Sequence, residues 1–152
     1  MKVSLVYDTK YGNTKLVAEE IMQGIKEVDW METEIGNIKD VTLEKLADAD
    51  LILIGSPNHM GRPTGTASGL IDELGKTPLK AKWVAVFDTY GGNDFEKAVR
   101  KMEQKLAEKV PGLKILAPGL SIKVNGMKGP IVEGELPKCR DFGKKLANQL
   151  KA

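Results

Sequence analysis

The chain has 152 residues, of which 41% are hydrophobic and 29% are charged, and its formal net charge is +2. These values fit one globular domain with its own core, and they exclude the strongly basic composition typical of nucleic-acid-binding domains. A single cysteine excludes an internal disulfide and favours a reducing compartment, and no apolar run approaches the length of a membrane span. Because the start of the chain carries no signal-peptide pattern, we expect a cytoplasmic protein.

Strand and helix patterns alternate along the whole chain. Apolar runs predict a first strand at about 2–7 and two buried parallel strands at 51–54 and 83–87. We expect an edge strand at about 31–35 and a last strand near 114–116, which residues 120–124 continue or accompany before an Asn125-Gly126 turn. Helices are predicted at about 13–27, 42–47, 64–75, 93–109 and 135–150. This alternation predicts an α/β fold in which helices cover both faces of a parallel sheet.

The segment Thr9-Lys10-Tyr11-Gly12-Asn13-Thr14 lies between the first predicted strand and the first predicted helix. The N–H groups of a first helical turn lack partners inside the helix, and the helix dipole is positive there. Thr9, Asn13 and Thr14 add side-chain donors around the same point. The spacing matches neither a Walker loop nor the three-glycine dinucleotide loop. We therefore predict that this segment binds a phosphate group.

Two glycine-rich loops, residues 55–63 and 88–94, follow the two buried strands. In a doubly wound sheet ligands bind beyond the carboxyl ends of the strands, so these loops should share one site with the first segment. Glycines let the backbone approach a flat polar ring, and Tyr90, Met60 and His59 are candidates for its walls. Since no loop holds paired carboxylates, a Ser-His-Asp set or a Cys/His cluster, we expect no catalytic residues and no metal.

Together the three loops resemble the FMN-binding loops of short-chain flavodoxins. The first resembles their phosphate loop, although Tyr11 stands where Thr or Ser is usual, and the other two resemble the loops beside the flavin. The resemblance covers the whole chain in element order and extends to the flavodoxin-like modules of flavodiiron proteins. It implies one flavodoxin-like FMN-binding domain over residues 1–152, with a five-stranded parallel sheet in the order 2-1-3-4-5. The strong acidity usual in the family is absent.

The resemblance implies that all three loops hold FMN. The expected residues are Thr9, Lys10, Tyr11, Gly12, Asn13, Thr14, Ser56, Pro57, Asn58, His59, Met60, Gly61, Asp88, Thr89, Tyr90, Gly91, Gly92 and Asp94. Tyr90 would stack on the flavin, unless it only caps its strand, and Met60 or His59 would cover the other face. His59 is either a solvent-exposed loop residue or a contact of FMN or of a partner. Arg62 is either a surface loop residue or a contact of a partner.

A peptide at Met60-Gly61 would flip on reduction, as the resemblance implies, so Gly61→Ala should bring the two reduction potentials closer together. Loop 88–94 carries Asp88 and Asp94 but no Lys or Arg, which favours a low potential. Cys139 lies on the last predicted helix, away from these loops, and is expected to be inert.

We therefore expect a low-potential carrier of single electrons between redox protein partners, with no nucleic-acid or membrane partner, acting as a monomer or weak dimer. Two alternatives stay open. An FMN-dependent NAD(P)H:quinone reductase-like enzyme usually carries extra segments, and none is evident here. A non-catalytic domain of the same topology, such as a receiver domain, needs an aspartate after the third strand, where this chain has Gly55-Ser56-Pro57.

Overall fold

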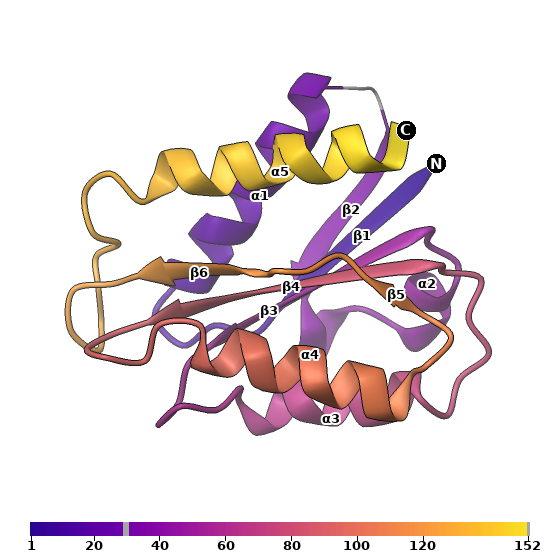
Figure 1. Cartoon of the computed structure of the whole chain (residues 1–152), viewed down its shortest axis with the longest axis horizontal. Helices are drawn as coiled ribbons and strands as arrows, with labels where there is room; N and C mark the ends of the chain where they lie inside the picture. Colours follow the sequence, from indigo (N-terminus) through magenta and orange to yellow (C-terminus); the bar gives the residue numbers. More distant parts are fainter. Residues whose placement is uncertain (29–30, 152) are drawn as a thin grey trace.

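The computed structural model describes residues 1–28 and 31–151, and in it parallel strands form one sheet between two layers of helices (Figure 1). The strands are β1 (Lys2–Tyr7), β2 (Glu32–Asn37), β3 (Leu51–Pro57), β4 (Trp83–Tyr90), β5 (Lys114–Ile115) and β6 (Leu120–Lys123). The helices are α1 (Asn13–Val28), α2 (Leu43–Ala47), α3 (Gly65–Leu74), α4 (Lys97–Lys109) and α5 (Leu136–Lys151), with a 3₁₀ turn η1 (Ile38–Asp40). No helix of the described residues is long and apolar enough to cross a membrane.

The strand order is β2-β1-β3-β4-β5, which confirms the predicted order 2-1-3-4-5. Both β5 and β6 pair with β4 in parallel, Trp83 opposite Lys114 and Phe87 opposite Leu120. Since β3 occupies the other side of β4, residues 120–123 continue the line of β5. The last strand is therefore one interrupted edge strand, which is the first of the two arrangements left open by the sequence.

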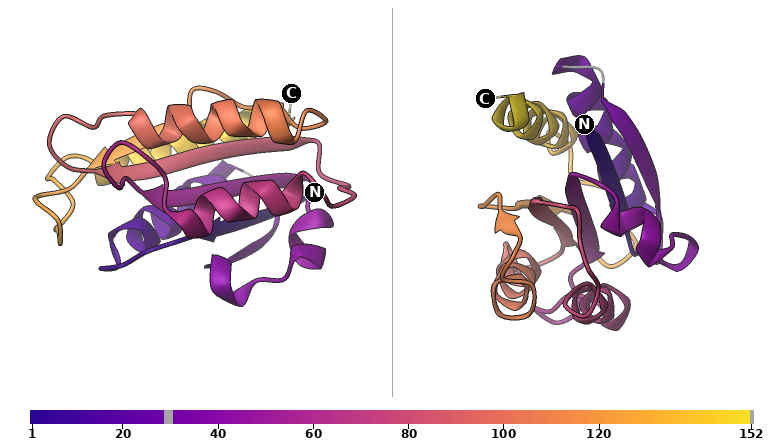
Figure 2. Two further views of the ribbon diagram at one scale, coloured as in Figure 1. Left: turned by 90° about the horizontal axis from the view of Figure 1, so that it is seen from below. Right: turned by 90° about the vertical axis from the view of Figure 1, so that its right-hand side faces the viewer.

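Two hydrophobic cores lie on the two faces of the sheet (Figure 2). On one face α1 and α5 pack against residues such as Leu53 and Phe87, and on the other α3 and α4 pack against residues such as Ile54 and Val86. Successive residues of β3 and β4 thus point alternately into the two cores. Both faces of these strands are buried, which is why their sequences are continuously apolar. The edge strand β2 is partly exposed, as its alternating sequence predicts.

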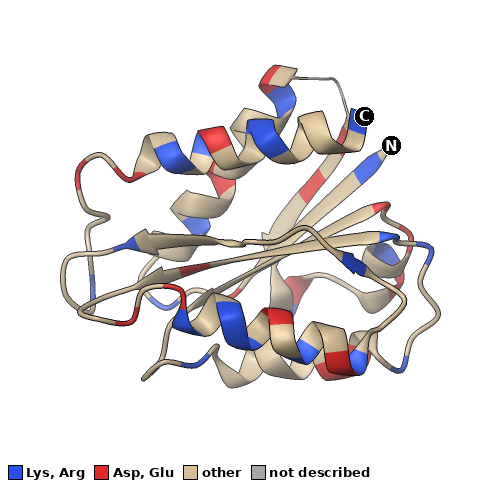
Figure 3. Ribbon diagram, in the orientation of Figure 1, with Lys and Arg blue, Asp and Glu red and all other residues tan. Residues whose placement is uncertain are grey.

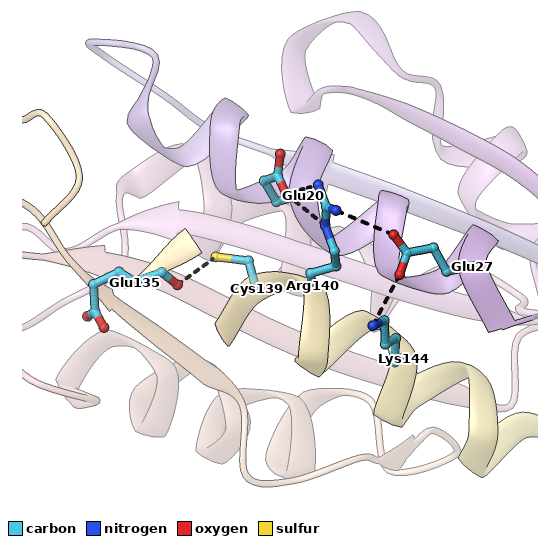
Figure 4. A network of polar contacts seen from close by, with 6 residues as sticks. All are labelled: Glu20, Glu27, Glu135, Cys139, Arg140 and Lys144. Atoms are coloured by element: carbon cyan, nitrogen blue, oxygen red, sulfur yellow. Dashed lines mark hydrogen bonds and ion pairs between the residues drawn. The ribbon is translucent and has the colours of Figure 1, made fainter. Parts of the chain in front are cut away.

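Helices α1 and α5 also carry ion pairs across their contact (Figure 4). Arg140 of α5 reaches Glu20 at 2.9 Å and Glu27 at 3.4 Å, and Lys144 reaches Glu27 at 3.2 Å. Beside them Cys139 is buried, with its sulfur 3.7 Å from the carbonyl oxygen of Glu135. Burial raises the pKa of this thiol to about 12, so Cys139 is an unreactive core residue.

The contact between α1 and α5 requires glycine at position 143. A Cβ atom there would lie only 2.0 Å from the carbonyl oxygen of Ile21, which is backbone and cannot rotate away. We therefore expect Gly143→Ala to lower the free energy of unfolding by about 1–3 kcal/mol in urea denaturation. Gly69→Ala is the matched control, because Gly69 is also helical but has nothing within 4 Å of an added Cβ atom. Equal effects of the two substitutions would contradict the close helix contact.

Three predicted boundaries are wrong, and all three errors lie beside the candidate site. Strand β3 continues to Pro57 rather than ending at residue 54. Strand β4 continues to Tyr90 rather than ending at Phe87, and helix α4 begins at Lys97 rather than near residue 93. Between them, residues 91–96 form a loop that ends at Glu96 in the left-handed region, with φ of +61°. The apolar run ends at Phe87, but the strand continues through two buried polar residues, Asp88 and Thr89. The apolar pattern therefore predicts a strand that is too short.

Candidate functional site

A cavity of about 490 Å³ opens beyond the carboxyl ends of β1, β3 and β4. This volume is within the usual range of small-molecule sites. The lining residues from the three predicted loops are Thr9, Lys10, Tyr11, Asn13, Thr14, Pro57, Asn58, His59, Met60, Thr89, Tyr90, Gly91 and Asp94. Three further lining residues, Val124, Gly126 and Met127, follow β6. The structure thus gathers most of the predicted residues around one space.

The first loop turns directly into α1. The Gly12 N–H donates to the Thr9 hydroxyl oxygen at 3.0 Å, and Gly12 has φ of +92°, which glycine adopts most easily. Because the Thr9 oxygen acts as the acceptor, its hydrogen is free to donate into the cavity. Among the described residues, the first-turn N–H groups of Asn13 and Thr14 have no acceptor. This end of the cavity therefore presents several donors and a helix dipole to an anion.

Thr14 connects this loop to the central sheet. Its side chain is buried, and its hydroxyl oxygen lies 2.9 Å from that of Thr89 at the end of β4. Tyr11, the residue that departs from the usual pattern, is 40% exposed and lies on the cavity wall. The Lys10 ammonium lies 5.5 Å from the centre of the Tyr11 ring, as in a cation–π pair.

The second loop is a tight turn at residues 59–62. His59 and Arg62 exchange two backbone hydrogen bonds of 2.7 and 3.0 Å, and Met60 and Gly61 have φ of +53° and +80°. Two successive positive φ angles define the turn type favoured in short hairpins. A positive φ is uncommon for methionine, and the Met60 side chain is 90% exposed at the cavity wall.

Asn58 holds the second and third loops together. Its side-chain oxygen accepts from the Gly61 N–H at 2.7 Å, and its side-chain nitrogen donates to the Asp94 carbonyl at 3.1 Å. The Asp94 carboxylate in turn lies 3.0 Å from the Lys97 ammonium. The relative positions of the two loops are thereby fixed by one asparagine.

Several predicted site residues do not line the cavity. Three of them are glycines of the loops that have a positive φ but do not line the cavity, namely Gly12, Gly61 and Gly92. Ser56 is a buried residue of β3, and its hydroxyl accepts from the Thr64 N–H at 2.9 Å. Ser56 therefore fixes the start of α3 rather than facing the cavity.

Asp88, which was also predicted to hold FMN, does not line the cavity either. It is a fully buried residue of β4 on the face covered by α4, where its carboxylate accepts from the Val99 N–H at 3.0 Å and the Ser121 hydroxyl at 2.5 Å. The Ser121 oxygen accepts from the Glu96 N–H at 2.9 Å. Burial raises the pKa of Asp88 to about 7, although these hydrogen bonds oppose the shift. Asp88 thus anchors loop 91–96 and the start of α4 from beneath.

Tyr90 ends β4 at the inner wall of the cavity. It is only 9% exposed, and its ring meets that of Phe95 edge to face with 5.5 Å between centroids. Burial raises the pKa of the Tyr90 phenol, so it stays neutral. The small exposed area suits a residue that caps its strand, and stacking on a flat ligand stays a prediction.

The contribution of residues 124–127 to the cavity was not predicted. The sequence indicates a turn at Asn125-Gly126, but no ligand contact was expected there. The signal was weak because this segment is far from the other loops in sequence and is brought to the cavity by tertiary contacts such as the pairing of β6 with β4.

A doubly wound sheet with a cavity at its strand ends, where the N-terminus of the first helix presents hydrogen-bond donors, is typical of nucleotide- or flavin-binding proteins. A sequence model of the family described as flavodoxin matches residues 5–130. The chain therefore belongs to the flavodoxin family, whose members bind FMN and transfer electrons.

Individual relatives agree with this assignment. The chain is 27% identical over 165 residues to a flavodoxin of Clostridium saccharobutylicum, with 99% of this chain and 98% of that protein covered. A solved flavodoxin from the domain Archaea is 27% identical and superposes with a TM-score of 0.83 over 100% of both chains. The flavodiiron protein from Giardia intestinalis, 19% identical, shares the fold with a TM-score of 0.79 over 97% of this chain and 36% of its own. The predicted similarity to flavodoxins and flavodiiron modules is confirmed.

Proposed function

We propose that residues 1–152 form one FMN-binding domain that carries single electrons at low potential between redox proteins, as a cytoplasmic monomer or weak dimer. The observation that supports this most directly is the shared cavity, in which the anion site at the start of α1 meets two glycine-rich loops. FMN combines a phosphate with a flat ring system and needs both features. When bound, it supplies the capacity to accept and release electrons.

The donor set at the phosphate end fits FMN. The Thr9 hydroxyl and the first-turn N–H groups of α1 are neutral dipoles, which are sufficient to bind a phosphate. Lys10 is exposed and lies beside the Tyr11 ring, so we infer a solvated lysine rather than a phosphate ligand. Asp94, a lining acid, belongs to the third loop and is paired with Lys97, so it opposes phosphate binding little.

Of the two acidic residues from which the sequence predicts a low reduction potential, one is buried away from the cavity and the other is paired with a lysine. Asp88 lies on the buried side of β4, and the charge of Asp94 is largely balanced by Lys97. A low potential is still supported by the third loop, because none of its described residues that line the cavity is a Lys or an Arg. The potential should therefore respond to Lys97 as well as to Asp94.

The turn at residues 59–62 is where this chain responds to reduction in our proposal. A flip of the peptide between Met60 and Gly61 would exchange the hydrogen bond from the Gly61 N–H to Asn58 for one between the freed peptide and the reduced flavin. Gly61 permits the change because glycine adopts both signs of φ. Gly61→Ala restricts the turn to one conformation. We expect its two reduction potentials to move closer by roughly 40 mV, the equivalent of a ~1 kcal/mol hydrogen bond, in a potentiometric titration.

Gly134→Ala is the control for this substitution. Gly134 also has a positive φ, of +88°, has nothing within 4 Å of an added Cβ atom, and lies outside the cavity lining. The peptide flip is refuted if Gly61→Ala leaves the separation of the two potentials at the wild-type value.

Electron transfer and enzymatic turnover can be separated in two experiments. In the first experiment the FMN-loaded chain is reduced chemically and mixed with a one-electron protein acceptor such as cytochrome c. In the second experiment the oxidised FMN-loaded chain is mixed with NAD(P)H and a quinone. We expect rapid reduction of the protein acceptor and no steady consumption of NAD(P)H. Sustained NAD(P)H oxidation by the chain alone would favour the quinone reductase alternative.

A further inference from the structure

Residues 124–131 form a hairpin that follows β6. Asn125 donates its N–H to the carbonyl of Pro130 at 2.8 Å, and Val124 and Ile131 face each other as an antiparallel bridge. The hairpin begins on the main sheet, because the Val124 N–H donates to the Tyr90 carbonyl at 2.8 Å. It therefore projects from the same strand end that bears Tyr90.

The tip of the hairpin lies against the predicted phosphate loop. The side-chain nitrogen of Asn13, the first residue of α1, donates to the Lys128 carbonyl at 3.0 Å. Gly129 backs onto the same side chain so closely that a Cβ atom would lie 2.6 Å from both terminal atoms of Asn13. One hydrogen bond and one close contact thus hold the two segments together.

The hairpin also forms part of the cavity wall. Val124, Gly126 and Met127 line the same space as Thr9 and Thr14. Met127 is 79% exposed, so its flexible thioether chain is available to a ligand. A molecule with its phosphate at the start of α1 would consequently lie beside Gly126 and Met127.

We propose that hairpin 124–131 is a fourth wall of the FMN site, which closes its phosphate end and slows the release of FMN. This inference rests on the proposed function, since it takes FMN as the ligand. The bond between Asn13 and Lys128 keeps the wall in place, and Met127 covers the bound molecule. The same contact would hold Asn13 and the first turn of α1 in the conformation that receives the phosphate.

Two glycine substitutions test this wall. Gly129 and Gly134 both have φ of +88°, which alanine disfavours at either position, but only Gly129 contacts Asn13. Each variant is loaded with FMN, and the dissociation rate is followed by the return of flavin fluorescence after dilution. We expect FMN to leave Gly129→Ala about tenfold faster than Gly134→Ala, the loss of one typical hydrogen-bonded contact. Equal rates in the two variants would overturn the proposal.

Met127→Ala keeps the test decisive if Gly129→Ala does not fold. Because Met127 is largely exposed, its truncation should leave the unfolding temperature of the flavin-free chain unchanged. Faster FMN release from Met127→Ala than from the wild type supports the wall, and an unchanged rate overturns it. Failure of the wild type to bind FMN would instead refute the proposed function.

Discussion

Asp88→Asn should stabilise the protein above pH 7 and change its stability little near pH 4. The pKa of Asp88 is raised from 3.8 to about 7 by burial, so the folded state holds a proton that the unfolded state releases. Stability contributed by this proton is complete below pH 3.8 and is lost as the pH rises through 7. The shift corresponds to about 4 kcal/mol, and asparagine removes this dependence because it does not ionise. Urea denaturation of both proteins between pH 4 and 9 measures the difference.

The hydrogen bonds around Asp88 supply the control. Asparagine can still accept from the Val99 N–H and donate to Ser121, so the start of α4 should keep its position. Ser121→Ala removes the hydroxyl that stabilises the charged carboxylate and should therefore lower stability most at alkaline pH. A stability difference between wild type and Asp88→Asn that stays constant across the pH range would show that Asp88 does not titrate there.

Thr9→Ala should weaken the binding of FMN by about 10- to 100-fold, while leaving the affinity for riboflavin almost unchanged. The Thr9 hydroxyl accepts from the Gly12 N–H and can donate to a phosphate, and a hydrogen bond to a charged group is worth about 1.5–3 kcal/mol. Riboflavin has the same ring system without the phosphate, so it reports on the rest of the cavity. Fluorescence titration of each ligand gives both dissociation constants.

Thr9→Ser restores the hydroxyl and should recover FMN affinity. If Thr9→Ala loses affinity for riboflavin as strongly as for FMN, the substitution has disturbed the whole cavity and Thr9 is no phosphate ligand. If neither affinity changes, the phosphate binds elsewhere.

The order of the sheet was predictable because its central strands have an unambiguous signature. Residues such as Leu53 and Ile54 feed opposite cores, and continuous apolar sequence of this kind is typical of a buried parallel strand. The end of β4 and the start of α4 were not predictable in the same way. The sequence predicts that Asp88 is a loop residue. In the structure its carboxylate is buried and accepts hydrogen bonds from Ser121, which is distant in sequence, and from the Val99 N–H at the start of α4. Tertiary contacts therefore decided both boundaries.

Some residues of the candidate site could likewise be predicted from local sequence, and others depend on tertiary contacts. Residues close to a strand end, such as Thr9, Asn58 and Gly91, could be placed at the cavity from local sequence and the general location of ligand sites in doubly wound sheets. Met127 could not, because its position depends on the contact between Asn13 and Lys128. Nor could a pattern distinguish Ser56 and Asp88, which face away from the cavity, from their neighbours, which line it.

Figure 3 shows basic residues along α4 and α5 with fewer acidic residues among them. Charged helical surfaces of this kind are typically solvated faces. The exposed side chains of Met60 and Met127 lie at the cavity itself, where a redox partner must approach to exchange electrons.

Titration of the flavin-free chain with FMN, followed by flavin fluorescence and visible absorption, tests the central proposal most directly. We expect the fluorescence to be quenched until one FMN is bound per chain, with a shifted absorption spectrum and much weaker binding of riboflavin. Unquenched fluorescence and an unchanged spectrum at every ratio would contradict the assignment of this cavity to FMN.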